Sequence, residues 1–146
     1  MQETTALVTG ASGEIGKAIA IALAEAGCRV ALHYARNEEG ARSAVSRIEA
    51  GGGRAIALQA DVSRRADTER LFAQVEEEFG FVGHLVNNAG VNRDTPLMMM
   101  SDEQWNEVID TNLGGTFFCS RLALRGMMHL GGGVITNMAS PSGVRG

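Results

Sequence analysis

The strongest constraint on this chain is a strict alternation between short apolar runs, typical of buried strands, and segments with helical periodicity. The expected strands cover residues 5–9, 29–34, 55–60, 84–87 and 134–138. The expected helices cover about residues 15–26, 38–50 and 66–79, and a long helix from 101 to about 128 is interrupted at Gly114-Gly115. Such alternation is produced by parallel strands joined through right-handed helical crossovers. We therefore predict an α/β fold with a doubly wound parallel sheet.

Local signals support the boundaries of the expected helices. Gly27 is expected to end the first helix, whose apolar face would comprise Ile15, Ile19, Ala22, Leu23 and Ala26. Asn37 can cap the second helix, and the run from Ser101 to Gln104 has the pattern of a capping box. In doubly wound sheets, ligands bind beyond the carboxyl ends of the strands. The polar residues of this sequence cluster at those ends.

A glycine-rich turn from Thr9 to Gly16 lies between the first expected strand and the first expected helix. Its glycines allow the backbone to pass close to a pyrophosphate, and free N–H groups at the helix start would face the negative charge. A turn with a purely structural role is the alternative. The position between a strand and a helix, with a second strand following, favours a Rossmann-type dinucleotide site.

Five stretches together resemble the short-chain dehydrogenase/reductase family, in an order and spacing that fit from near Thr4 to the last residue. They are Thr9-Gly10 with the following glycines, Asp61-Val62, Asn87-Asn88-Ala89-Gly90, Asp110-Thr111-Asn112-Leu113 and the run from Val134 to Ser140. The Asn-Asn-Ala-Gly run is the most specific of them. Within the family, the chain looks most like the 3-oxoacyl-(acyl carrier protein) reductases and the related acetoacetyl-CoA and polyketide ketoreductases.

The resemblance implies a role for each matching position. It places Gly10, Ser12, Ile15 and Gly16 at the pyrophosphate and ribose, Asp61 and Val62 at the adenine, and Asn88, Ala89 and Gly90 at the ribose and nicotinamide. It implies that Asn112 holds a water of the proton relay and that Ser140 hydrogen-bonds the substrate carbonyl oxygen. Taken singly, each has a structural alternative: a strand-end cap for Ser140, an exposed helix position for Asn112 and a turn for Asp61.

The end of the second strand bears on the choice of cofactor. An acidic residue there would accept from the 2′-hydroxyl of NAD, but this sequence has Tyr34-Ala35-Arg36-Asn37. The Arg36 guanidinium suits a 2′-phosphate, so we expect NADP(H). A solvated arginine beside Glu38 and Glu39 is the alternative. Glu14, where the family usually has glycine, would oppose a bound diphosphate unless it points to solvent.

The catalytic acid of the family is a tyrosine followed four residues later by a lysine, about a dozen residues past the serine. This chain has one tyrosine, Tyr34, and its one lysine is Lys17, and neither fits that pattern. We expect residues 1–146 to form an incomplete dinucleotide-binding domain, truncated after the fifth strand, which lacks the catalytic and substrate part and is inactive alone. Val134 to Met138 would then be an edge strand.

The parent activity that we expect is the NADPH-dependent reduction of a 3-oxoacyl thioester, carried by acyl carrier protein or coenzyme A, to the 3-hydroxyacyl form. Another short-chain carbonyl or alcohol dehydrogenase is the near alternative, and a non-catalytic dinucleotide-binding module is the alternative from a different class. The resemblance also implies a homo-oligomer, a dimer or tetramer in which the long helix packs against a neighbouring subunit.

The composition of the chain also excludes some classes of binding partner. The net charge is −4 with no basic block, so nucleic acid and anionic membranes are poor partners. No apolar run approaches the length of a membrane span, and no signal peptide is expected, so we expect a cytoplasmic protein. Cys28 and Cys119, like His33, His84 and His129, have no metal-ligand spacing, and we expect no metal site.

Overall fold

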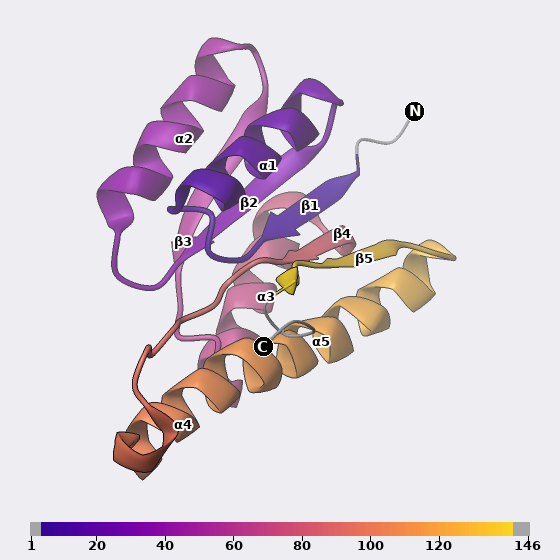
Figure 1. The fold of residues 1–146 in the computed structure, drawn as a ribbon. Helices are drawn as coiled ribbons and strands as arrows, with labels where there is room; N and C mark the ends of the chain where they lie inside the picture. The colour runs from indigo at the N-terminus through magenta and orange to yellow at the C-terminus, as the bar shows by residue number, and fades with distance from the viewer. Residues whose placement is uncertain (1–3, 142–146) are drawn as a thin grey trace.

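A computed structural model describes residues 4–141 of the chain. Its five strands form one sheet in the order β3-β2-β1-β4-β5, and every neighbouring pair is parallel (Figure 1). The strands are β1 (Thr5–Val8), β2 (Arg29–Tyr34), β3 (Arg54–Gln59), β4 (Val82–Asn87) and β5 (Val134–Asn137). The predicted doubly wound α/β fold is confirmed.

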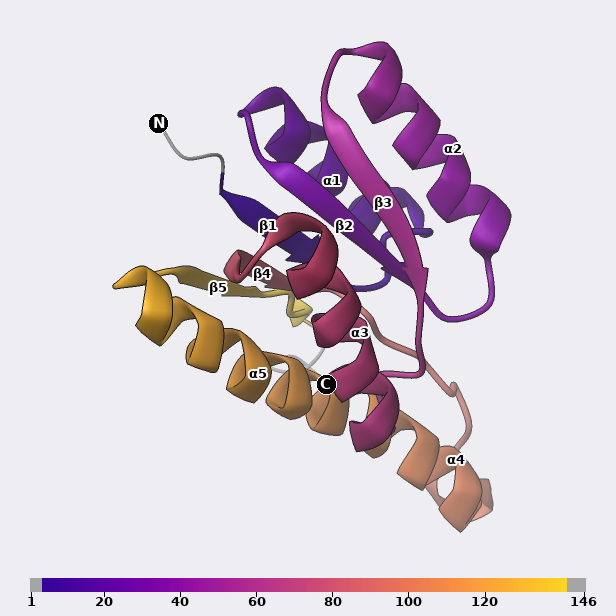
Figure 2. The same ribbon diagram turned by 180° about the vertical axis from the view of Figure 1, so that it is seen from behind.

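Helices cover both faces of the sheet. One face carries α1 (Glu14–Glu25) and α2 (Glu38–Ala50), and the other carries α3 (Arg65–Phe79) and α5 (Gly115–Leu130), as the two opposite views in Figures 1 and 2 show. The connection from β4 to α5 contains the short 3-10 helix η1 (Leu97–Met99), then α4 (Asp102–Val108) and the π-helical segment η2 (Ile109–Gly114). Within residues 4–141, no helix has both the length and the apolar composition needed to cross a bilayer.

The hydrophobic core is divided by the sheet because the central strands are buried on both faces. In β1, Ala6 and Val8 belong to the cluster that also holds residues of α2, whereas Leu7 belongs to the cluster with residues of α3 and α5. This is the period of two expected of a strand, with both sides apolar. β1 is therefore fixed between helical layers, and the turn that follows it has a fixed starting point.

The predicted apolar face of α1 is partly wrong. Its fully buried residues are Gly16 and Ala20, and Ile19 and Leu23 pack against the core, but Ile15 is 63% exposed. The helix approaches so closely that a Cβ on Gly16 would lie 2.5 Å from the Gly10 carbonyl oxygen. Small residues therefore form the buried face, because larger ones would hold α1 away from the turn.

The predicted interruption of the long helix at Gly114-Gly115 is also wrong. The chain stays helical and only widens into a π-helical segment, which ends at Gly114, before α5 continues. Gly115 does not break the helix but brings it close to the loop after β3, because a Cβ there would lie 2.9 Å from Val62 Cγ2. The predicted capping box at the start of α4 is confirmed: Ser101 and Gln104 accept each other's backbone N–H groups.

The strand β5 lies at the edge of the sheet, as predicted, with β4 as its neighbour. Its residues are mostly exposed, including Val134, and Ile135 packs against the core from the side of α3 and α5. The buried Asn87 amide donates to Asn137 Oδ1 at 2.9 Å and to Ser120 Oγ at 3.0 Å. These contacts hold the carboxyl ends of β4 and β5 together against α5.

Candidate functional site

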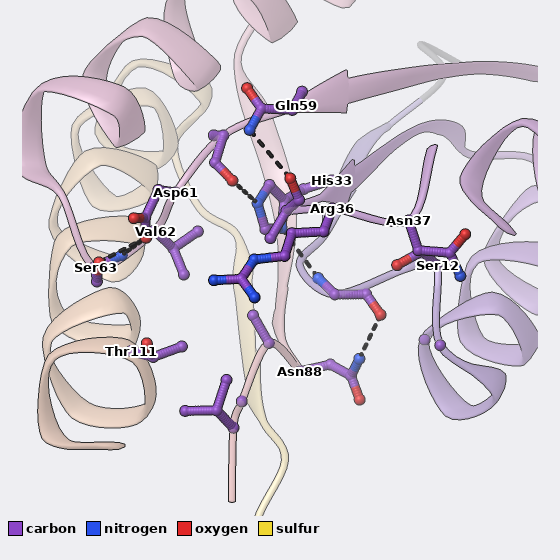
Figure 3. A pocket seen from close by; sticks show the side chains of 18 of the residues that line it. Ser12, His33, Arg36, Asn37, Gln59, Asp61, Val62, Ser63, Asn88 and Thr111 are labelled. Atoms are coloured by element: carbon purple, nitrogen blue, oxygen red, sulfur yellow. Dashed lines mark hydrogen bonds between the residues drawn. The ribbon is translucent and has the colours of Figure 1, made fainter. Parts of the chain in front are cut away.

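A cavity of about 960 Å³ opens at the carboxyl edge of the sheet. Its walls come from the turn after β1, the ends of β2 and β3, the segment after β4 and the helices α4 and η2 (Figure 3). All ten residues that the sequence predicts for nucleotide binding line it: Gly10, Ser12, Ile15, Gly16, Arg36, Asp61, Val62, Asn88, Ala89 and Gly90. Residues from four separate parts of the sequence therefore meet where the predicted fold places a ligand.

The turn after β1 requires glycine at Gly10. Its φ angle is +64°, in the left-handed region, and a Cβ there would lie 2.9 Å from the Ala89 Cα. The close approach brings the backbone after β1 against the backbone after β4. A side chain at this position would separate two walls of the cavity.

Hydrogen bonds fasten the same two walls together. The buried Thr9 hydroxyl accepts from the backbone N–H groups of Asn88 and Ala89, both at 3.0 Å, and donates to the Val86 carbonyl. The Asn88 amide donates to the carbonyl oxygens of Thr9 and Gly10 at 3.0 and 3.2 Å. Asn88 thus lines the cavity while its amide nitrogen donates to the turn after β1.

The start of α1 forms another part of the cavity wall. Its N-cap, Gly13, contributes no side-chain hydrogen bond, and the first N–H groups of an α-helix have no partner within the helix. Together with the helix dipole, they form a place for an anion. The Glu14 carboxylate is 95% exposed and lies 3.8 Å from Lys17 Nζ, so its charge is directed toward solvent.

Arg36 and Asp61 supply the charges near the ends of β2 and β3. Figure 3 shows the Arg36 side chain extending into the space between Val62 and Asn88. Arg36 makes no ion pair with any residue among 4–141, and Glu38 instead binds Arg42 at 2.7 Å. Asp61 Oδ1 accepts from the backbone N–H and the hydroxyl of Ser63, which fixes the carboxylate at the cavity edge.

The far wall carries an ion pair that the sequence analysis does not predict. Arg93 contacts both carboxylate oxygens of Glu107, with 2.8 Å between Arg93 Nε and Glu107 Oε2, and both residues line the cavity. This pair joins the segment after β4 to α4. The Arg93 charge is therefore neutralised locally, whereas that of Arg36 is not.

The two predicted catalytic residues lie outside the cavity lining. Asn112 is on η2, where its amide group forms a two-way contact with the Val91 backbone: Oδ1 accepts from the Val91 N–H at 2.8 Å, and Nδ2 donates to its carbonyl at 3.0 Å. Ser140 follows β5 and is exposed. Their predicted roles remain predictions.

Two residues at the base of the cavity were missed by the sequence analysis of the site. Thr9 is named there only as part of a motif, although its hydroxyl joins β1 to β4. His33 is only 1% exposed and contacts both the turn after β1 and the end of β3. A histidine in the apolar run of β2 is the one signal that could have identified it, because buried polar groups require partners.

The profile of the short chain dehydrogenase family matches residues 4–146. The 3-oxoacyl-[acyl-carrier-protein] reductase FabG of Staphylococcus aureus is 43% identical over 142 residues, which are 97% of this chain and 58% of that protein. The 3-oxoacyl-[acyl-carrier-protein] reductase of a Synechocystis species is 43% identical over 141 residues, 97% of this chain and 57% of that protein.

A solved structure is similar over the whole chain. It is a crystal structure from Sinorhizobium meliloti 1021, described as a short-chain alcohol dehydrogenase, with a TM-score of 0.93 and 40% identity. The match covers 100% of this chain and 57% of that one. The chain thus spans less than two thirds of the length of the relatives that it matches.

Proposed function

The chain belongs to the short-chain dehydrogenase family, and on this basis we propose that it provides the nucleotide-binding part of an NADPH-dependent reductase of 3-oxoacyl thioesters. The proposal for the substrate is supported by the similarity of the chain to the 3-oxoacyl-[acyl-carrier-protein] reductases of S. aureus and Synechocystis. Another short-chain carbonyl or alcohol dehydrogenase is the second candidate, supported by the description of the S. meliloti structure.

The observation that carries the nucleotide proposal is the start of α1. A helix without an N-terminal side-chain cap faces a cavity lined by Gly10, Ser12 and Gly16, and the pyrophosphate of a dinucleotide would satisfy its first N–H groups. The residues present therefore fit the cofactor. Asp61 would accept from the adenine amino group, and Asn88, Ala89 and Gly90 would line the ribose and nicotinamide side.

The proposed reaction divides its tasks between the cofactor and the chain. The bound nicotinamide would supply hydride to the carbonyl carbon of the substrate. Ser140 would orient the carbonyl oxygen, and Asn112 would hold a water of the proton relay. Tyr34 is on β2 and Lys17 is on α1 beside Glu14, so these two residues do not form the tyrosine–lysine pair that the resemblance implies, and we place the catalytic acid outside these 146 residues.

Turnover of acetoacetyl-CoA with NADPH tests the proposed activity. We expect the intact protein that carries this chain to oxidise NADPH, and we expect the polypeptide 1–146 to bind the nucleotide without turnover. The absence of positioned acid catalysis alone lowers a rate by about a hundredfold or more. Turnover by sequence-verified 1–146 near the rate of the intact protein would contradict the assignment of the acid. Nucleotide binding without turnover in the intact protein would favour a non-catalytic binding module.

A further inference from the structure

His33, which is almost fully buried, joins the two halves of the cavity at its base. Its Nδ1 lies 3.1 Å from the Gly10 backbone nitrogen, and its Nε2 lies 3.1 Å from the Ala60 carbonyl oxygen. Its own carbonyl oxygen accepts from the Ala11 N–H at 2.8 Å. Gly10 and Ala11 belong to the turn before α1, whereas Ala60 directly precedes Asp61 and Val62. One residue of β2 therefore sets the spacing between the proposed pyrophosphate and adenine sides.

The partners of the imidazole determine its protonation state. The Gly10 N–H can only donate, so Nδ1 must accept and carries no proton. The Ala60 carbonyl can only accept, so Nε2 carries the proton and donates. His33 is thus a neutral imidazole, with both nitrogens used. An imidazolium would direct Nδ1–H against the Gly10 N–H, with two donors facing each other.

The turn cannot easily adjust to such a clash. A Cβ on Gly10 would lie 2.9 Å from the Ala89 Cα, and a Cβ on Gly16 would lie 2.5 Å from the Gly10 carbonyl oxygen, so the turn has little room on either side. A displacement of Gly10 would therefore move the start of α1 as well. The protonation of His33 would therefore disturb the wall that faces the phosphates, although the imidazole is almost fully buried at the base of the cavity.

We propose that His33 is a positioning residue for the nucleotide: as a neutral imidazole it bridges the glycine turn and the end of β3, and its protonation weakens nucleotide binding. This inference rests on the proposed nucleotide site. It adds a residue that makes nucleotide binding dependent on pH, although this residue is neutral in the binding-competent state and makes no ion pair with the nucleotide.

The charges around His33 agree with a neutral ring. Burial lowers the pKa of His33, and this effect exceeds the smaller raising effects of the Ala60 hydrogen bond and the Asp61 carboxylate. Asp67 from α3 accepts the Asp61 backbone N–H at 3.3 Å, Arg36 extends from the loop after β2, and Glu14 at the start of α1 is directed toward solvent. Nucleotide affinity should therefore be at its maximum above the ordinary histidine pKa of about 6.5, and it should fall as the pH drops through the lowered pKa of His33.

The pH dependence of the dissociation constant is the direct test. The probe is ADP-ribose, which keeps the adenosine and pyrophosphate but has no 2′-phosphate that titrates in the same range. In calorimetric titrations of the intact protein from pH 5 to 8.5, we expect a constant Kd at high pH and a rise toward about tenfold per pH unit on the acid side. Nitrogen NMR of the ligand-free protein should show an unprotonated Nδ1 and a protonated Nε2 for His33.

Two substitutions separate the two contacts. His33→Asn keeps an acceptor near the Nδ1 position but cannot titrate, so its binding should lose the acid-side rise. His33→Gln keeps a donor toward Ala60 but leaves the partly buried Gly10 N–H without its acceptor, so it should weaken binding about tenfold even at pH 8. His129→Asn is the matched control, because His129 is exposed on α5 and stacks on Phe81 away from the cavity. It should retain the wild-type pH profile.

The outcomes distinguish this inference from the proposed function. If neither ADP-ribose nor NADP⁺ binds at any pH, the proposed function is wrong and the inference falls with it. If ADP-ribose binds and the wild-type profile matches that of His33→Asn, the role of His33 is wrong while the nucleotide site stands. A protonated Nδ1 in ligand-free protein at pH 8 would overturn the inference independently of any variant.

Discussion

Of the two arginines that line the cavity, Arg93 is paired with Glu107, whereas Arg36 has no ion-pair partner among residues 4–141. Its guanidinium extends over the floor of the cavity, and its acidic neighbour Glu38 is already bound to Arg42. A guanidinium in this setting can bind a 2′-phosphate through charged hydrogen bonds. The free energy of binding should therefore distinguish two cofactors that differ only in that phosphate.

We predict that Arg36→Ala weakens NADP(H) binding tenfold or more and leaves NAD(H) binding nearly unchanged. A hydrogen bond to a charged group contributes about 1.5–3 kcal/mol, which corresponds to roughly ten- to hundredfold in the dissociation constant. Calorimetric titration with both cofactors measures the effect. Arg47→Ala, an exposed arginine of α2 outside the cavity lining, is the control. Equal losses for both cofactors would show that Arg36 supports the fold instead.

At the level of residues, sequence predicts best where backbone geometry imposes the residue type. Gly10 and Gly16 could be predicted from the glycine-rich turn and the family resemblance, and the structure adds the close contacts that exclude a side chain at both positions. His33 was missed because its role depends on partners from two other strands, Gly10 and Ala60, and a single strand sequence shows neither. The Arg93–Glu107 pair was missed for the same reason, since its partners come from different elements.

The start of α4 is the clearest case of a helix boundary set by local chemistry. Ser101 Oγ accepts the Gln104 N–H at 3.2 Å, and Gln104 Oε1 accepts the Ser101 N–H at 3.0 Å. The Gln104 amide also donates to Thr95 Oγ1 at 3.1 Å. The cap thus fixes both the first turn of α4 and the segment that precedes it.

We predict that Ser101→Ala lowers the free energy of unfolding by about 1 kcal/mol, because it removes one half of the capping box. The corresponding fall in Tm is about 2–4 °C for a chain of this size or somewhat larger. Thermal melts followed by circular dichroism measure it. Ser46→Ala, at an exposed position within α2, should change the Tm by less than about 1 °C. An unchanged Tm for Ser101→Ala would show that α4 is stabilised by its packing contacts and not by its cap.

Element types could be predicted because periodicity and caps are local, but two details depended on tertiary packing. The predicted apolar face of α1 included Ile15, which the approach of Gly16 to the turn leaves on the exposed side. The glycines at 114 and 115 looked like a helix break, but Gly115 serves the packing of α5 against Val62. Propensity favours a break there, and packing overrides it.

The whole molecule exposes apolar surface along its longest helical segment. Leu113, Phe117, Leu124 and Met128 are all more than half exposed, with spacings that place them on related turns of η2 and α5. The edge strand β5 also exposes Val134. Buried apolar surface contributes about 25 cal/mol per Å², so contact between two such faces would be favourable.

We predict that the polypeptide 1–146 self-associates at low micromolar concentration. Light scattering beside a thermal melt measures this behaviour. Leu124→Glu, within this exposed face, should reduce the association, whereas Leu97→Glu, an exposed leucine on η1, should not. A monodisperse monomer with a cooperative transition above about 60 °C would contradict the prediction, and it would favour a self-sufficient binding module.

The central position of β1 has a consequence for biosynthesis. β1 leaves the ribosome before the other four strands of this sheet, yet its second neighbour is β4, and the Thr9 hydroxyl pairs with Asn88, which is synthesised 79 residues later. Pairings between such distant residues are slow to form because a long loop must close first. The nascent chain therefore cannot assemble the floor of the cavity until β4 emerges. Until then, α1 packs beside a β1 strand that has only β2 as a neighbour. A pause in translation before residue 82 would prolong the stage at which β1 offers an open edge to other chains.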